Sequence, residues 1–229
     1  MYTLVIVRRT ILALLLGVWG SQGSASPSAL CEEAAQYASR QTGVPLSILR
    51  AVTLAETGHT QPDNAAFDAW PWAVMSDMEG NWFPDQESAI AFVEDLVAQG
   101  KSNIDVGCFQ LNIRWHAHAF PSVDAMFSPK SNALYAANFL NDLFQQTGNW
   151  RAAVGRYHSS DEVRAERYVR RLETIFDTHL AHTAPAFDAP ETTAPERVAT
   201  AYERFSLVSA RGPLLQTPTR VRPLIGGTP

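Results

Sequence analysis

The chain has 229 residues, 46% of them hydrophobic and 10% aromatic, which is enough apolar material for one folded domain with extensions. Between Ser28 and Thr183, eleven Lys or Arg residues are outnumbered by nineteen Asp or Glu residues, a net charge of −8. This composition argues against nucleic-acid binding, which needs a concentrated basic footprint, and predicts no basic patch for anionic lipid.

The first 25 residues have the pattern of a secretory signal peptide. Arg8 and Arg9 precede an apolar run, Ile11–Trp19, and a small, polar stretch follows it. The run is shorter than the roughly 20 apolar residues that a membrane-spanning helix needs. We therefore expect export by the general secretory route, cleavage after Ala25 and a periplasmic location, with an uncleaved anchor as the alternative.

The chain contains two cysteines, Cys31 and Cys108. An exported protein meets an oxidising compartment, where an even number of cysteines indicates pairing. We therefore predict a disulfide between them. The alternative is a lipid anchor on Cys31, which Leu30 disfavours because a lipoprotein signal has a small residue in that position.

Two helices are expected at the start of the folded part. The first spans Cys31–Gln41, with Ser28 as candidate N-cap and Gly43 as the stop. Pro45 opens the second helix, and Gly58 ends it. Its residues at three- and four-residue spacing form one face. They are Leu46, Leu49, Val52, Thr53 and Glu56.

Glu56 closes this otherwise apolar face. Desolvation disfavours the charged form of a carboxyl, and the negative end of its own helix acts in the same direction. Both effects raise the pKa of Glu56 and would keep it protonated, as a general acid must be. The alternative is an ordinary glutamate that points to solvent at a frayed helix end.

The remaining elements indicate a mainly α-helical domain with a small β-hairpin. The hairpin lies between His59 and Asp105, with its turn at 79–81. A helix follows over Asp85–Gly100, capped by Asp85. Three further helices are predicted at Pro129–Thr147, Trp150–Tyr157 and Asp161–His182.

Beyond Thr183 the chain is rich in proline and poor in large apolar clusters, which is typical of a disordered tail. Ala194–Val208 could form a short docking helix. The expected organisation is a signal peptide at 1–25, a folded domain at 26–183 and a flexible tail at 184–229.

Three separated segments can be read together: AVTLAETG at 51–58, GCFQLN at 107–112 and AAVGRYHS at 152–159. In order and spacing they resemble the three motifs of the lysozyme-like soluble lytic transglycosylase family. Those motifs are a catalytic Glu-Ser-Gly, a Gly-Leu-Met-Gln-Ile segment, and an alanine-rich helix that delivers a tyrosine before Asn-x-Gly. Here Thr57 and His158 replace the serine and the asparagine. Three motifs in one order are more specific than any one alone.

The resemblance covers about two thirds of the chain and implies a lysozyme-like α+β fold and a peptidoglycan substrate. It implies that Glu56 protonates the bond between N-acetylmuramic acid and N-acetylglucosamine. Glu56 then accepts a proton from the muramic C6 hydroxyl, so that a 1,6-anhydro sugar forms. An intramolecular hydroxyl needs no second carboxylate to activate it. We expect no cofactor and no metal.

The same resemblance implies which residues bind the glycan. Gln110 and Tyr157 match cleft positions, where an amide can bind sugar groups and a phenol can orient the carboxyl or the acetamido group. Asn112 is a further candidate, and Trp70 or Trp72 could line the cleft with an aromatic face. The alternatives are ordinary ones, with Gln110 bonding loop backbone and Tyr157 packing in the core.

The tryptophan-containing insert at 70–72 and the segments 105–108 and 155–159 are similar to transglycosylases that accompany envelope-spanning machines. Flagella and secretion systems are such machines. The resemblance therefore implies a partner from a flagellum or secretion apparatus, which we expect to bind through the C-terminal tail. Such an enzyme would remodel the wall locally around the machine.

Three other functions remain open from the sequence. A hydrolytic muramidase would pair Glu56 with Asp105 or Asp77 to activate water. A metallopeptidase is suggested by His116, His118 and His158, although the His-Glu-x-x-His pattern is missing. A non-catalytic assembly factor would use the fold only to hold glycan.

Overall fold

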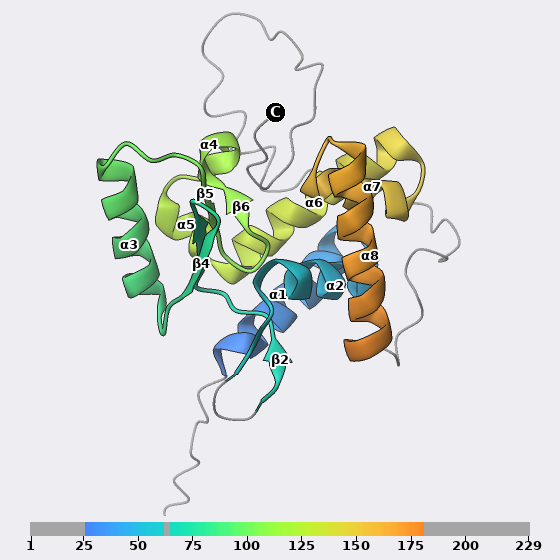
Figure 1. Ribbon diagram of the computed structural model, residues 1–229, viewed down its shortest axis with the longest axis horizontal. Coiled ribbons are helices and arrows are strands. Elements are labelled where there is room, and N and C mark those ends of the chain that lie inside the picture. The colour runs from blue at the N-terminus through green and yellow to red at the C-terminus, as the bar shows by residue number, and fades with distance from the viewer. Residues whose placement is uncertain (1–25, 62–64, 181–229) are drawn as a thin grey trace, which may run out of the picture.

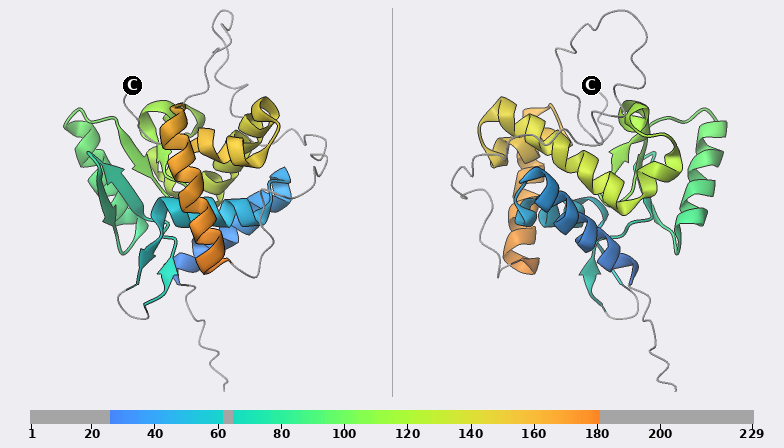
Figure 2. Two further views of the ribbon diagram at one scale, coloured as in Figure 1. Left: turned by 45° about the vertical axis from the view of Figure 1, so that its right-hand side comes forward. Right: turned by 180° about the vertical axis from the view of Figure 1, so that it is seen from behind.

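The computed structural model describes residues 26–61 and 65–180, which form a mainly helical body with two small antiparallel sheets (Figure 1). In all views the four-stranded sheet and α3 (Gln86–Ala98) lie at one end of the molecule. Helices α7 (Trp150–His158) and α8 (Glu162–His179) lie at the other end (Figure 2). The predicted signal peptide and tail lie outside the described residues. In the part described, no helix is both long and apolar enough to cross a membrane.

The first two helices are α1 (Pro27–Thr42) and α2 (Leu46–Thr57). The expected N-cap at Ser28 is wrong: the cap is Ser26, whose side chain accepts from the Ala29 amide. The helix begins at the residue after this cap, Pro27, because proline is well suited to the first position of a helix, where an N–H would have no partner. Gly43 ends α1 with φ 76°, as predicted.

The four-stranded sheet contains the expected hairpin, but the predicted turn at 79–81 is wrong. Strands β3 (Ala73–Ser76) and β4 (Glu79–Trp82) are joined at Asp77 and Met78, whose φ angles of 52° and 67° suit a twisted hairpin. Gly80 lies within β4, where a side chain would collide with the ring of Trp82. The glycine therefore signals a close contact and not a turn.

Strands β5 (Ile104–Val106) and β6 (Leu111–Asn112) complete this sheet in the order β4-β3-β5-β6. The predicted cap of α3 is confirmed, because Asp85 accepts from the Ser88 amide at 2.8 Å. The other sheet pairs β1 (His59–Thr60) with β2 (Phe67–Asp68). Short helices that the sequence analysis did not predict follow β6: α4 (Ile113–His116), η1 (Ala117–Ala119) and α5 (Val123–Phe127).

The core forms where α1, α2, α6 (Pro129–Thr147), α7 and α8 meet. Helix α1 crosses α6, as the rear view in Figure 2 shows. Helix α6 has the predicted bounds, and α7 extends one residue further. Helix α8 starts one residue later than predicted and ends at His179, so the predicted end at His182 is wrong. Leu49 of α2, Leu140 of α6 and Leu172 of α8 are fully buried and place these helices around one core.

A buried turn between β5 and β6 connects the sheet to the helices. Gly107 has φ 80°, and a Cβ atom there would lie 2.5 Å from the Asn132 amide nitrogen, so only glycine fits. The Asn132 side chain accepts from the Phe109 amide and donates to the carbonyls of Val106 and Met126. One amide side chain thus satisfies three buried backbone groups.

The predicted disulfide between Cys31 and Cys108 is confirmed, with the two Cα atoms 5.7 Å apart. Both cysteines are fully buried, and the bond joins α1 to the turn after β5 across 77 residues. A crosslink over a loop of this length restricts the unfolded chain strongly.

We therefore expect replacement of both Cys31 and Cys108 by alanine to lower the free energy of unfolding by about 4 kcal/mol. Urea unfolding of the oxidised parent and the double variant measures this difference. The parent under reducing conditions is the control and should approach the variant. Equal unfolding midpoints for all three proteins would contradict a stabilising role for the bond.

Candidate active site

Glu56 lies in the last turn of α2, against α8. Its Oε1 atom accepts a hydrogen bond of 2.5 Å from the Tyr168 hydroxyl, although 112 residues separate the two side chains. Tyr168 is almost completely buried, and Glu56 is partly so. The alternative of a freely solvated glutamate at a frayed helix end is therefore wrong.

The electrostatic environment favours the neutral form of Glu56. Burial raises its pKa to about 8, because a charged carboxylate loses its hydration there. The Tyr168 hydrogen bond and the positive charge of Arg171 lower the pKa, and Asp105 raises it. Burial is the largest of these effects, so Glu56 carries a proton at neutral pH.

His158 packs behind Tyr168. The two rings are stacked, with centroids 4.3 Å apart and planes at 4°. Burial, together with the charges of Arg171 and Arg164, lowers the pKa of His158 to about 4. A neutral ring therefore supports Tyr168 from the side, so His158 contacts the tyrosine that bonds Glu56.

The turn after β5 is tied directly to the helix that carries Glu56. The carbonyl of Cys108 accepts from the Thr53 hydroxyl at 2.8 Å, one helical turn before Glu56. Thr57, beside Glu56, reaches the same carbonyl at 3.4 Å. The first and second sequence motifs therefore lie side by side.

Gln110 lies in this turn, with φ 48° and only 3% of its surface exposed. Its amide nitrogen donates to the carbonyls of Ala73 and Gly107, at 3.1 and 3.0 Å. These bonds are the contacts with loop backbone that the sequence left open as the alternative to sugar binding. The Gln110 amide nitrogen therefore holds β3 to the turn, and a sugar contact by this residue stays a prediction.

Tyr157 and Tyr168 have different functions in the structure. Tyr157 is fully buried, and its hydroxyl donates to the Phe109 carbonyl at 2.8 Å. The tyrosine that the third motif singled out thus fixes the buried turn, and Tyr168 donates to Glu56. Sequence reasoning missed Tyr168, because its spacing from Leu172 on α8 is that of an ordinary core residue.

Asn112 is fully buried, and its amide donates to Asp105 at 2.7 Å and to Asn103 at 3.0 Å. Trp72 is partly buried and packs against the core. Both side chains have structural contacts, so their roles in glycan binding stay predictions.

Trp70, the other tryptophan predicted for the cleft, lies near Glu56 together with Trp82 and His59. Trp82 is 43% exposed, and its indole N–H donates to the Thr57 carbonyl at 3.1 Å. The Trp70 amide donates to the Thr57 hydroxyl, also at 3.1 Å. His59 lies between the two indole rings, with centroid distances of 5.3 and 5.2 Å. These aromatic side chains gather around the residue that follows Glu56.

The side chains suggested for other functions are dispersed. Asp77 lies at the tip of the β3–β4 hairpin, where it bonds Lys101, whereas Asp105 is buried in β5 and interacts electrostatically with Glu56. His116 is buried and bonds Tyr135, and His118 is exposed. Among residues 26–61 and 65–180, no three His, Cys, Asp or Glu side chains are grouped so that they could hold a metal ion.

No family model, curated protein or solved structure matches the chain. The chemical capacity of the site follows from its own geometry. Glu56 can donate a proton, since it is neutral, and Tyr168 can stabilise the carboxylate that remains. The site is therefore suited to general acid catalysis followed by general base catalysis by one group.

Replacement of Glu56 by glutamine should change how stability depends on pH. The pKa of Glu56 lies at about 8 in the folded protein and at 4.5 for an exposed glutamate. Its stabilising contribution is therefore complete below pH 4.5 and is lost as the pH rises through 8. Between these values the parent should lose about 1.4 kcal/mol per pH unit relative to Glu56→Gln. Urea unfolding at several pH values measures this, and parallel stability curves would contradict it.

Removal of the Tyr168 hydroxyl should raise the pKa of Glu56 above that of the parent, because the hydrogen bond favours the ionised carboxylate. NMR titration of glutamate labelled at its carboxyl carbon measures the change in Tyr168→Phe. Tyr157→Phe is the matched control, since that hydroxyl bonds Phe109 instead. An equal pKa in Tyr168→Phe and the parent would refute the assignment.

Proposed function

We propose that this protein is a peptidoglycan lytic transglycosylase with Glu56 as its catalytic acid and base. The observation that carries the proposal is a neutral, partly buried carboxyl held by one tyrosine hydroxyl. The three motif-like segments support it, because two of them lie together at Thr53 and Cys108 and the third supplies Tyr157 to the same turn.

In the proposed reaction, Glu56 first donates its proton to the oxygen of the bond between N-acetylmuramic acid and N-acetylglucosamine. The C1–O bond breaks, and the C6 hydroxyl of the same muramic residue attacks C1. The hydroxyl proton passes to the Glu56 carboxylate, which restores the acid. The products are a 1,6-anhydromuramic end and a free N-acetylglucosamine hydroxyl, and no water is consumed.

The Tyr168 hydrogen bond suits both halves of this cycle. Because the tyrosine donates to Oε1, the proton of neutral Glu56 belongs on Oε2, which is the atom left to face the substrate. After proton transfer, the same hydrogen bond stabilises the negative carboxylate. The pKa of about 8 places the group close to a pH at which it can both donate and accept.

The aromatic side chains beside Thr57 fit a sugar substrate. Trp82 is exposed and anchored through its indole N–H, so the ring is both accessible and fixed. Such a ring can pack against the C–H face of a hexose. We infer that Trp82 contributes to the glycan cleft, in addition to Trp70 and Trp72.

The proposal includes a lysozyme-like architecture and a periplasmic location. A helix that ends in a catalytic acid, packed beside a small antiparallel sheet, supports the first. The Cys31–Cys108 disulfide supports the second, because such bonds persist in oxidising compartments. Action around a flagellum or secretion apparatus belongs to the proposal as well, although the tail expected to bind that partner lies outside the described residues.

The decisive experiment analyses the soluble muropeptides that the mature protein and Glu56→Gln release from purified sacculi. We expect 1,6-anhydromuramic ends by mass spectrometry, and a loss of at least about a hundredfold in rate for the variant. Glu33→Gln is the control, since it makes the same change at an exposed glutamate of α1 and leaves the acid intact. Equal release by the parent and Glu56→Gln would refute the acid role and favour a non-catalytic glycan-binding protein.

A hydrolytic muramidase is the second candidate, and the observation that favours it is the electrostatic interaction between Asp105 and Glu56. An ionised Asp105 could activate water on the opposite face of the sugar. The same product analysis separates the two reactions. Reducing muramic ends, together with a large loss of rate in Asp105→Asn, would replace the transglycosylase proposal by the muramidase.

A further inference from the structure

Basic side chains concentrate on one helix of an otherwise acidic domain. Of the eleven Lys and Arg residues between Ser28 and Thr183, four lie on α8. They are Arg164, Arg167, Arg170 and Arg171. The helix that supplies Tyr168 to Glu56 therefore carries more arginines than any other helix of the described residues, although four acidic side chains on it match them in number.

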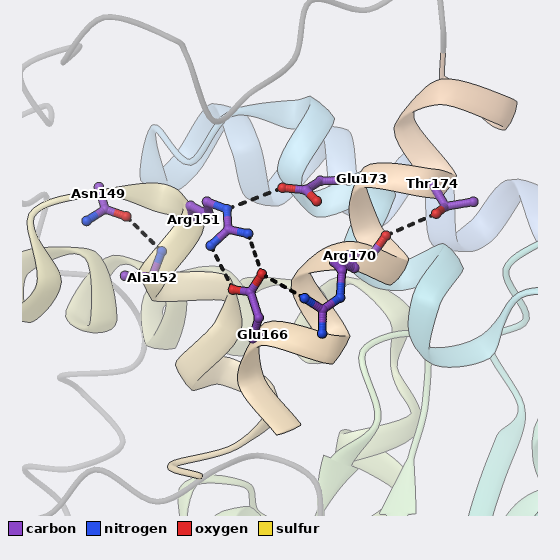
Figure 3. A network of polar contacts seen from close by, with 7 residues as sticks. All are labelled: Asn149, Arg151, Ala152, Glu166, Arg170, Glu173 and Thr174. Atoms are coloured by element: carbon purple, nitrogen blue, oxygen red, sulfur yellow. Dashed lines mark hydrogen bonds and ion pairs between the residues drawn. The ribbon is translucent and has the colours of Figure 1, made fainter. Parts of the chain in front are cut away.

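On the outer face of α8 the positive charge is neutralised. Arg151 of α7 forms a bidentate pair with Glu166 and a further bond to Glu173 (Figure 3). Arg170 bonds Glu166 from the other side, at 3.3 Å. These four side chains pair with one another and join α7 to α8.

The other three arginines follow one another at three- and four-residue spacing and form a stripe along α8, which we call the arginine stripe (Arg164, Arg167 and Arg171). Tyr168 comes four residues after Arg164 and three before Arg171, so the arginine stripe borders Tyr168 on the helix surface. All three arginines are exposed.

The three arginines of the stripe differ in their partners. Arg164 bonds Ser159 and lies 3.8 Å from Asp161. Within residues 26–61 and 65–180, Arg167 and Arg171 form neither ion pairs nor hydrogen bonds through their side chains. Two like charges four residues apart destabilise a helix slightly, so the stripe does not serve the stability of α8.

The charge of the stripe reaches the site. Arg171 acts electrostatically on Glu56 and Tyr168, and together with Arg164 it acts on His158. A carboxylate on a substrate whose reacting sugar lies at Glu56 would therefore be attracted by this charge. Of the three arginines, Arg167 and Arg171 have guanidinium groups available to pair with it within the described residues.

We propose that the arginine stripe binds the carboxylates of the peptide stems of peptidoglycan and thereby directs the protein to strands that carry peptides. This inference rests on the proposed function. The stem is attached to the lactyl group of N-acetylmuramic acid, the same sugar whose C6 hydroxyl Glu56 would deprotonate. A peptide carboxylate is consequently delivered close to the catalytic acid, and guanidinium groups bind carboxylates in a planar, two-bond geometry.

The test compares two substrates: intact sacculi, and the free glycan strands that remain when an amidase has hydrolysed the peptide stems from their lactyl groups, which leaves only the lactyl carboxylate on each muramic residue. For the parent, we expect kcat/KM to be higher on the peptide-bearing strands. In the double variant Arg167→Gln, Arg171→Gln this preference should fall roughly tenfold, mainly through a higher KM on intact sacculi. Added salt should reduce the parent's preference in the same direction, because the contacts are exposed.

Arg170→Gln is the matched control, since it removes the same charge from the paired face of α8 and should keep the parent's preference. Replacement of Arg167 and Arg171 by lysine should retain part of it, because the charge remains without the planar fork. In a Glu56→Gln background, co-sedimentation of each variant with intact sacculi measures binding without turnover, and calorimetric titration measures it for the free glycan strands.

The outcomes separate the two proposals. If the parent forms no anhydro ends from either substrate, the proposed function fails, and this inference fails with it. If anhydro ends form but the preference is the same in the parent and the double glutamine variant, only the inference is overturned. Arginine-dependent binding to vesicles of anionic phospholipid, with an unchanged preference between the two substrates, would also overturn it and indicate a membrane surface.

Discussion

The turn from Gly107 to Gln110 is buried, so its backbone groups need hydrogen-bond partners inside the protein. Thr53 of α2, Asn132 of α6 and Tyr157 of α7 supply them, and the disulfide adds Cys31 of α1. Each partner side chain can reach the turn only when its helix lies at the right place and is rotated about its own axis by the right angle. The turn therefore determines how four helices are arranged around the sheet.

The position of Glu56 is a consequence of this arrangement. Once Thr53 bonds the Cys108 carbonyl, Glu56 lies one turn further along α2, where it faces α8. Burial there raises its pKa, and Tyr168 limits the increase. The balance leaves a neutral acid that can become a base, so the proposed chemistry depends on contacts between elements rather than on the glutamate alone.

The arginines of α8 extend the same argument from the acid to its substrate. Arg170 on one face of the helix is paired with Glu166, whereas Arg167 and Arg171 beside Tyr168 form no ion pair within the described residues. Total charge hides this difference, because an acidic domain can contain a local basic stripe. The composition excluded a broad basic surface but could not show which arginines lacked partners.

Local patterns predicted much of the fold. Gly43 and Asp85 end and begin helices as expected, because capping depends on neighbouring backbone groups. The hairpin turn was misplaced, since Gly80 is needed for contact with Trp82 and not for a turn. The predicted first helix, which starts at Cys31, is about one turn shorter than the observed helix, which starts at Pro27.

The sequence by itself determined the longer helices, the disulfide partners and the presence of a carboxyl on an apolar helical face. These features follow from periodicity, from capping residues and from the number of cysteines, all of which can be read over short distances or by counting. The tertiary structure decided that Tyr168 rather than Tyr157 bonds Glu56, that Gln110 holds backbone, and which arginines of α8 are paired. Both tyrosines have the spacing of core residues, and only the packing of α2 against α8 selects which hydroxyl reaches the carboxyl.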